Sequence, residues 1–225
     1  ISAVLSFSGH AIDADNQALQ AAYQVKLAEW NSERELFEQS RSNVIQAMSL
    51  VESNDIKAME VVAEYLLNRI TWPRQTDIGF GISSCGRVVG VDLDLPDEDE
   101  VPTTAATVGV NRLLIKKRSE PQMRRDFVSL AYGAVFRVAG ELFAGLPTID
   151  KVVISSYVQR RCEGTGKIND EYVMSAIIDR AGWSEINFGQ IDLIDPASAI
   201  GRFELRVKPD RSSRLQDITR FEMTD

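Results

Sequence analysis

A long stretch without proline or glycine, from Asp13 or Asp15 to about Val51, most constrains how this chain can fold. Either aspartate can cap a helix N-terminus, and nothing downstream stops the helix. Apolar side chains recur along the stretch at steps of three, four or seven residues, which is the spacing of one helix face. These residues are Tyr23, Leu27, Trp30, Phe37, Val44 and Met48. Arg34 and Arg41 interrupt the stripe, so we expect a helix with a narrow apolar face that projects or packs along one edge.

Residues 1–9 precede this helix, and their apolar content, which includes Val4, Leu5 and Phe7, predicts a short strand. The segment lacks the basic start of a secretory signal peptide. The first residue is not methionine, so we expect either a fragment of a longer protein or a chain from which a preceding segment has been lost or removed.

A second helix is predicted from Ile56 to about Ile70. Asn54 or Asp55 supplies its N-terminal cap, and the dipeptide Trp72-Pro73 ends it, because the residue before a proline disfavours helical backbone. The two helices together predict a helical hairpin ahead of any strand.

The hydrophobic period then changes from helical to alternating. Apolar residues alternate with polar residues or glycine over 78–82 and 89–95, which predicts a β-hairpin with one solvated face. A further strand is predicted within 108–117. A second hairpin is predicted over 152–158 and 172–178.

One strongly apolar helix is predicted between these hairpins. Ser119 is its cap, Gln122 completes a capping box, and Gly145 stops it. The sequence therefore predicts an α+β fold, in which antiparallel β-hairpins form a sheet covered by one long helix. We expect a helical hairpin region over residues 1–72 and a sheet domain over 73–225, either as two domains or as one continuous domain.

Composition limits the classes of function. The 225 residues carry a net charge of −8, which argues against a general nucleic-acid binder. The two cysteines, Cys85 and Cys162, and the single histidine, His10, cannot build a four-ligand zinc site. No apolar run is long enough to span a membrane. We expect a cytoplasmic protein without a cofactor and without membrane association.

Two strand carboxylates, Asp92 and Asp94, lie two residues apart and therefore share one face. With the acidic residues 97–100 they could bind Mg²⁺ or Ca²⁺ through oxygen ligands, as a metal-dependent nuclease or phosphohydrolase requires. The alternative is the solvated face of an amphipathic strand followed by a charged loop.

The densest basic stretch leads into the predicted helix at Ser119. Its members are Arg112, Lys116, Lys117, Arg118, Arg124 and Arg125. A helix N-terminus favours anions, so this segment could bind phosphate, a nucleotide or nucleic acid. The alternative is a solvated strand end whose cations balance nearby acids. No residues are assigned to catalysis.

Several short motifs resemble those of an uncharacterised bacterial domain. They are Asp94-Leu95-Pro96, Glu141-Leu142-Phe143, residues 152–157, Thr165-Gly166, Asn187-Phe188, Asp195-Pro196 and residues 221–225. That domain occurs upstream of Mrr-type restriction endonuclease domains and behind a small N-terminal module of unknown function. The resemblance covers about residues 20–225, with Ser156 in place of the usual glycine, and it implies an accessory or sensing role in bacterial defence or DNA processing.

We therefore expect a non-catalytic interaction domain that binds a protein partner, a second copy of itself or a nucleic acid. The helical hairpin and the basic segment are its candidate surfaces, and a dimer through the long helix is one form it could take. The metal-dependent enzyme and the phosphate or nucleotide sensor are the alternatives.

Overall fold

The computed structural model describes residues 2–109, 112–162 and 164–224, with side chains described from Asn16 onward. The chain divides into two compact units, residues 1–46 and 47–225. The first unit consists of most of one helix, α1 (Ser2–Leu50), which confirms the predicted long helix. The predicted strand over residues 1–9 is wrong from residue 2 on. A helix satisfies its own backbone hydrogen bonds, whereas a strand needs a neighbouring strand.

The second helix, α2 (Ile56–Asn68), belongs to the second unit and begins at the predicted cap. The Asp55 carboxylate accepts a hydrogen bond from the Ala58 backbone nitrogen at 2.9 Å. Before it, Asn54 adopts a left-handed conformation with φ of 60°, which ends a short 3-10 turn, η1 (Val51–Ser53). One face of α2 is buried in the core through Met59, Val62, Ala63, Leu66 and Leu67.

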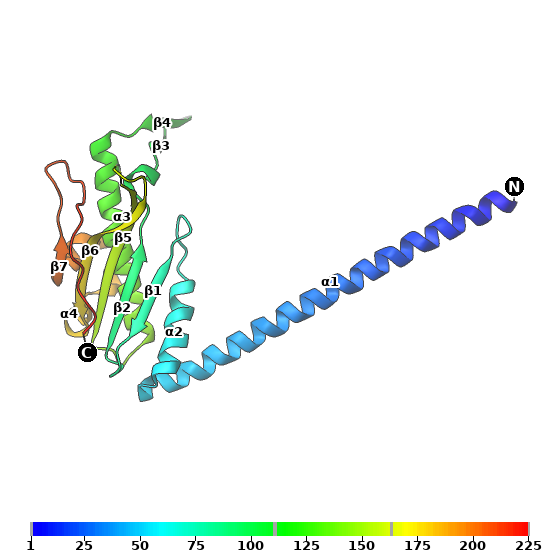
Figure 1. Cartoon of the computed structure of the whole chain (residues 1–225), viewed down its shortest axis with the longest axis horizontal. Helices are drawn as coiled ribbons and strands as arrows, with labels where there is room; N and C mark the ends of the chain where they lie inside the picture. Colours follow the sequence, from blue (N-terminus) through cyan, green and yellow to red (C-terminus); the bar gives the residue numbers. More distant parts are fainter. Residues whose placement is uncertain (1, 110–111, 163, 225) are drawn as a thin grey trace. The chain divides into compact units, whose positions relative to one another are not determined.

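Five strands form the main sheet in the order β1-β2-β5-β6-β7 (Figure 1). They are β1 (Ile78–Ile82), β2 (Val88–Asp94), β5 (Lys151–Arg161), β6 (Ile168–Asp179) and β7 (Glu204–Val207). The two predicted hairpins are confirmed as β1–β2 and β5–β6. The expectation of a wholly antiparallel sheet fails at one junction, because β2 and β5 pair in parallel. The chain between them is long enough to cross over and re-enter the sheet in the same direction.

The crossover contains α3 (Glu120–Gly145), the predicted covering helix. Ser119 and Gln122 form the expected capping box. Phe127, Val138 and Leu142 are fully buried against the sheet core. Among the described residues, α3 is the one helix long and apolar enough to cross a membrane by length and composition. Its packing on the sheet accounts for that composition, so the α+β class is confirmed with α3 as a core helix.

The remaining elements are short. A 3-10 turn, η2 (Glu98–Glu100), precedes a separate two-stranded ribbon of β3 (Thr104–Val108) and β4 (Leu113–Lys117). Of the strand predicted over 108–117, Val108 ends β3 and Leu113–Lys117 form β4, while residues 110–111 lie outside the described part of the chain. After β6 come α4 (Arg180–Ser184), η3 (Phe188–Leu193) and α5 (Pro196–Ile200).

Different parts of the chain pack on the two faces of the sheet. Val89, Val91 and Leu93 join the main core on the helix side, whereas Val88, one position away, packs with Val153 and Phe221. Side chains alternate across a strand, so Phe221 marks the opposite face. The end of the C-terminal segment, at Phe221, therefore packs on the face that the helices leave open.

Candidate functional site

Three surfaces of the described chain could carry function: a stripe on α1, a groove beside α3, and the charged residues singled out from sequence. The stripe on α1 carries the most exposed aromatic rings of the described chain. Tyr23, Trp30 and Phe37 lie seven residues apart on α1 and are 60%, 54% and 67% exposed. Because seven residues make two helical turns, the three rings lie along one line.

A second line runs beside the first and begins with Leu27, which is partly exposed. Arg34 and Arg41 continue it at intervals of seven residues and are exposed. The Arg34 guanidinium lies 5.2 Å from the centre of the Trp30 ring and within 3.6 Å of the Glu38 carboxylate. We call these six side chains the α1 seam: Tyr23, Leu27, Trp30, Arg34, Phe37 and Arg41. Its two heptad lines are the pattern by which helices pair side by side.

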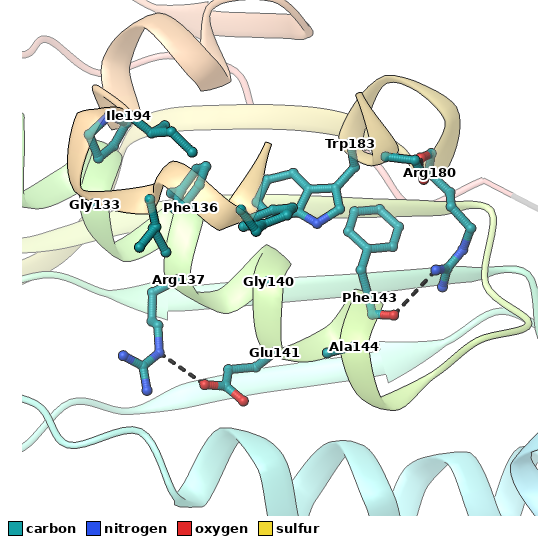
Figure 2. A pocket seen from close by; sticks show the side chains of 14 residues that line it. Gly133, Phe136, Arg137, Gly140, Glu141, Phe143, Ala144, Arg180, Trp183 and Ile194 are labelled. Atoms are coloured by element: carbon teal, nitrogen blue, oxygen red, sulfur yellow. Dashed lines mark hydrogen bonds and ion pairs between the residues drawn. The ribbon is translucent and has the colours of Figure 1, made fainter. Parts of the chain in front are cut away.

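A groove of about 760 Å³ lies between α3 and the segment from α4 to α5 (Figure 2). Trp183 forms its wall, with ring centroids 4.9 Å from Phe136, 5.5 Å from Phe143 and 5.4 Å from Phe188. A Cβ at Gly140 would lie in ordinary van der Waals contact with the Trp183 ring, at 3.6 Å, so this glycine keeps the space beside the ring open. An apolar and aromatic lining of this kind is typical of ligand pockets, so the groove can accept an apolar group.

Arg180 fixes one end of this wall. Its guanidinium donates to the backbone carbonyls of Ile149 and Phe143, at 2.6 and 3.2 Å, and lies 4.9 Å over the Phe143 ring. Burial lowers the pKa of Arg180. On the rim, Arg137 donates to Glu141 at 3.0 Å, as Figure 2 shows. Arg180 and Arg137 are therefore both engaged in contacts within the protein.

The two strand aspartates predicted as metal ligands are each held by an arginine. Arg220 donates to Asp92 at 2.7 Å, and Arg74 donates to Asp94 at 3.0 Å. Burial raises the pKa of Asp94, which is 6% exposed. Among the described residues, no group of three His, Cys, Asp or Glu side chains could hold a metal ion. The geometry therefore gives the metal hypothesis no support.

The predicted basic stretch separates into paired and unpaired members. Arg118 binds Asp126 at 2.6 Å, and Arg124 lies within 3.4 Å of Glu120. The other four are exposed, three of them on or beside the ribbon and one on α3: Arg112, Lys116, Lys117 and Arg125. Two of the six residues are therefore held in ion pairs, and the other four remain exposed.

An ion-pair cluster that sequence reasoning missed lies next to them. Glu98 meets three guanidinium groups, those of Arg124, Arg160 and Arg214, at 3.6 to 3.9 Å. Arg160 also binds Glu171 at 3.0 Å. The cluster joins η2, β5, β6 and the C-terminal segment, so its role is to hold these elements together. The sequence contains no local motif that would predict this cluster, because its members are distant in sequence.

Comparison with known proteins identifies no relative. No family model matches the sequence, and no curated protein matches it. The solved structure of a sex pheromone precursor from Lactobacillus salivarius is similar at a TM-score of 0.25 and 6% identity. The similar region covers 47% of this chain and 29% of the other protein. A similarity of this size supports no statement about function.

Proposed function

We propose that this protein is a non-catalytic interaction domain that self-associates through α1. The observation that carries the proposal is the α1 seam. In its unit the helix is the one described element, and three aromatic rings on it are more than half exposed. A lone helix gains most of its stability from packing an apolar face, so such a seam requires a partner helix.

A second copy fits this seam in the antiparallel orientation. In a parallel, in-register pair, Arg34 would face Arg34 of the other copy and Arg41 would face Arg41, and like charges at close range repel. Reversing one helix brings each line opposite the other. Tyr23 then meets Arg41, Leu27 meets Phe37, and Trp30 meets Arg34. Each arginine gains an aromatic ring, a contact worth about 0.5–1 kcal/mol at exposed sites.

The biological setting of this role rests on the motif resemblance. An accessory domain near restriction-type nucleases would use self-association to bring attached modules together. That role in bacterial defence or DNA processing is part of the proposal and requires no catalytic residue in the chain.

Sedimentation velocity of the intact chain tests the proposal. We expect a dimer, and we expect Phe37→Glu to convert it to monomer, because the carboxylate would face Leu27 in an apolar layer. The matched control is Val25→Glu, an equally drastic change at a 58% exposed position on the far side of the helix. A wild-type chain that stays monomeric at high concentration, or equal effects of the two variants, would contradict the proposal.

A further inference from the structure

We propose that the β3–β4 ribbon is an arm that binds double-stranded nucleic acid. The first observation is its charge. Residues 101–119 contain Arg112, Lys116, Lys117 and Arg118 and not one aspartate or glutamate, within a chain whose net charge is −8. The ribbon is therefore a locally positive element of an acidic protein, and local charge influences where a polyanion binds.

The second observation is the ribbon's apolar face. The antiparallel register places Val108 opposite Leu113 and Ala106 opposite Ile115. Opposite residues share a face, so Val108, Leu113 and Ile115 lie together, and they are 88%, 59% and 68% exposed. The ribbon pairs with no other described strand, and a hairpin with its apolar face in water is marginally stable on its own.

The base of the ribbon is anchored. The Arg118 backbone nitrogen donates to the Thr103 carbonyl at 2.8 Å, and the Arg118 side chain binds Asp126 of α3 at 2.6 Å. Within the described part of the chain, Arg112, Lys116 and Lys117 form no ion pair and are exposed. Three cations therefore remain available on an element that is fixed at one end.

The placement of these cations favours a duplex over a flat anionic surface. Side chains alternate between faces along β4, so Lys116 projects from the side opposite Leu113 and Ile115, whereas Lys117 shares their side. On a membrane that received the apolar face, Lys116 would point away from the headgroups. A major groove about 12 Å wide admits a two-stranded ribbon, and the phosphates that line its two walls can receive cations from more than one side of that ribbon.

This inference does not depend on self-association through α1, because the ribbon and the α1 seam share no residue. Fluorescence anisotropy of a labelled mixed-sequence DNA duplex, titrated with the intact chain, tests it. We expect binding in about 50 mM salt that weakens steeply toward 200 mM, with a log–log slope near −3 for about three phosphate contacts.

The deciding variant is Lys116→Glu/Lys117→Glu, which should weaken duplex binding at least about tenfold. Its control is Lys57→Glu/Lys208→Glu, which makes the same charge change at two exposed lysines outside the ribbon and should bind like wild type. Circular dichroism checks that both variants are folded.

Three results would overturn the inference. They are equal losses in both double variants, tighter binding to the single strand than to the duplex, and binding to phosphatidylserine vesicles without binding to DNA. The last result would assign the ribbon to a lipid surface.

Discussion

Arg220 lies against Asp92, its Nη1 donating to Oδ1 at 2.7 Å, and this contact joins the C-terminal segment to β2. The same nitrogen donates to the Tyr172 hydroxyl at 2.8 Å, and the guanidinium lies 4.9 Å over the Tyr172 ring. Next to it, the Phe221 backbone nitrogen donates to the Ser175 hydroxyl at 3.0 Å. Arg220 and Phe221 therefore act as a clamp that holds the segment on the sheet.

We expect Arg220→Met to lower the free energy of unfolding by about 1 kcal/mol, because a partly exposed ion pair contributes no more than that. Hydrogen exchange at the Phe221 amide should rise together with this loss. Arg202→Met, which removes an exposed pair with Glu185, is the comparison and should change stability less. Equal losses from both variants would argue against a clamp.

The hydrophobic periods predicted most elements but not how they meet. Alternation over 78–82 and 89–95 indicates a hairpin, and it is found. The same pattern contains no information about which strand β2 meets on its other side, because the crossover through α3 decides that. The strand β7 was missed because residues 204–207 are few and half polar.

In the candidate site, too, some features could be predicted from the sequence and others depend on the folded chain. The heptad spacing of Tyr23, Trp30 and Phe37 can be recognised in the sequence, because the three residues lie on one helix. The partners of Asp92 and Asp94 are not, because Arg220 and Arg74 approach from other segments and only the folded chain brings them there.

The protonation of Asp94 makes stability depend on pH in an unusual direction. Burial raises its pKa even though Arg74 is bound to it. The folded protein therefore holds this proton more tightly than the unfolded chain, and the associated stability is present at low pH and lost as pH rises above about 4. Urea unfolding of wild type and Asp94→Asn across this range should show wild type losing stability relative to the variant.

Asp195 provides the opposite case in the same molecule. Its hydrogen bonds with Ser198 at the start of α5 lower its pKa. The stability from this cap is present above about pH 4 and is lost as pH falls. The difference between wild type and Asp195→Asn should therefore grow as pH rises. The same slope in both pairs would show that these local environments do not set the titrations.

Two glycines of α3 should respond in opposite directions to alanine. A Cβ at Gly133 would meet no atom within 4 Å, whereas a Cβ at Gly145 would collide with the Leu66 side chain. Alanine is preferred to glycine within a helix by about 0.5–1 kcal/mol. We expect Gly133→Ala to raise the free energy of unfolding by that amount and Gly145→Ala to lower it, as thermal unfolding would measure. A stabilised Gly145→Ala would show that Leu66 moves aside freely.

The groove at Trp183 should accept an apolar aromatic probe in the native state. We expect anilinonaphthalene sulfonate to fluoresce when bound there and Gly140→Leu to abolish most of the signal, because a leucine side chain would fill the space beside the ring. Gly133→Ala keeps the groove open and is the control. An unchanged signal in Gly140→Leu would place the probe elsewhere.

The orientation of the proposed α1 pair can be decided by charge and by cross-linking. Antiparallel pairing places Trp30 opposite Arg34, so Trp30→Glu creates a new ion pair and should weaken the dimer far less than Phe37→Glu. In a parallel pair, either substitution would place Glu opposite Glu, so the two variants should weaken the dimer to a similar degree. For cross-linking, Cys85 and Cys162 are first replaced by serine. Chains with Gln24→Cys are then mixed with chains carrying Glu38→Cys and oxidised. Antiparallel helices bring these two positions together near the seam, so we expect the mixed disulfide to dominate over both symmetric products on a non-reducing gel. Symmetric products in excess would establish a parallel pair.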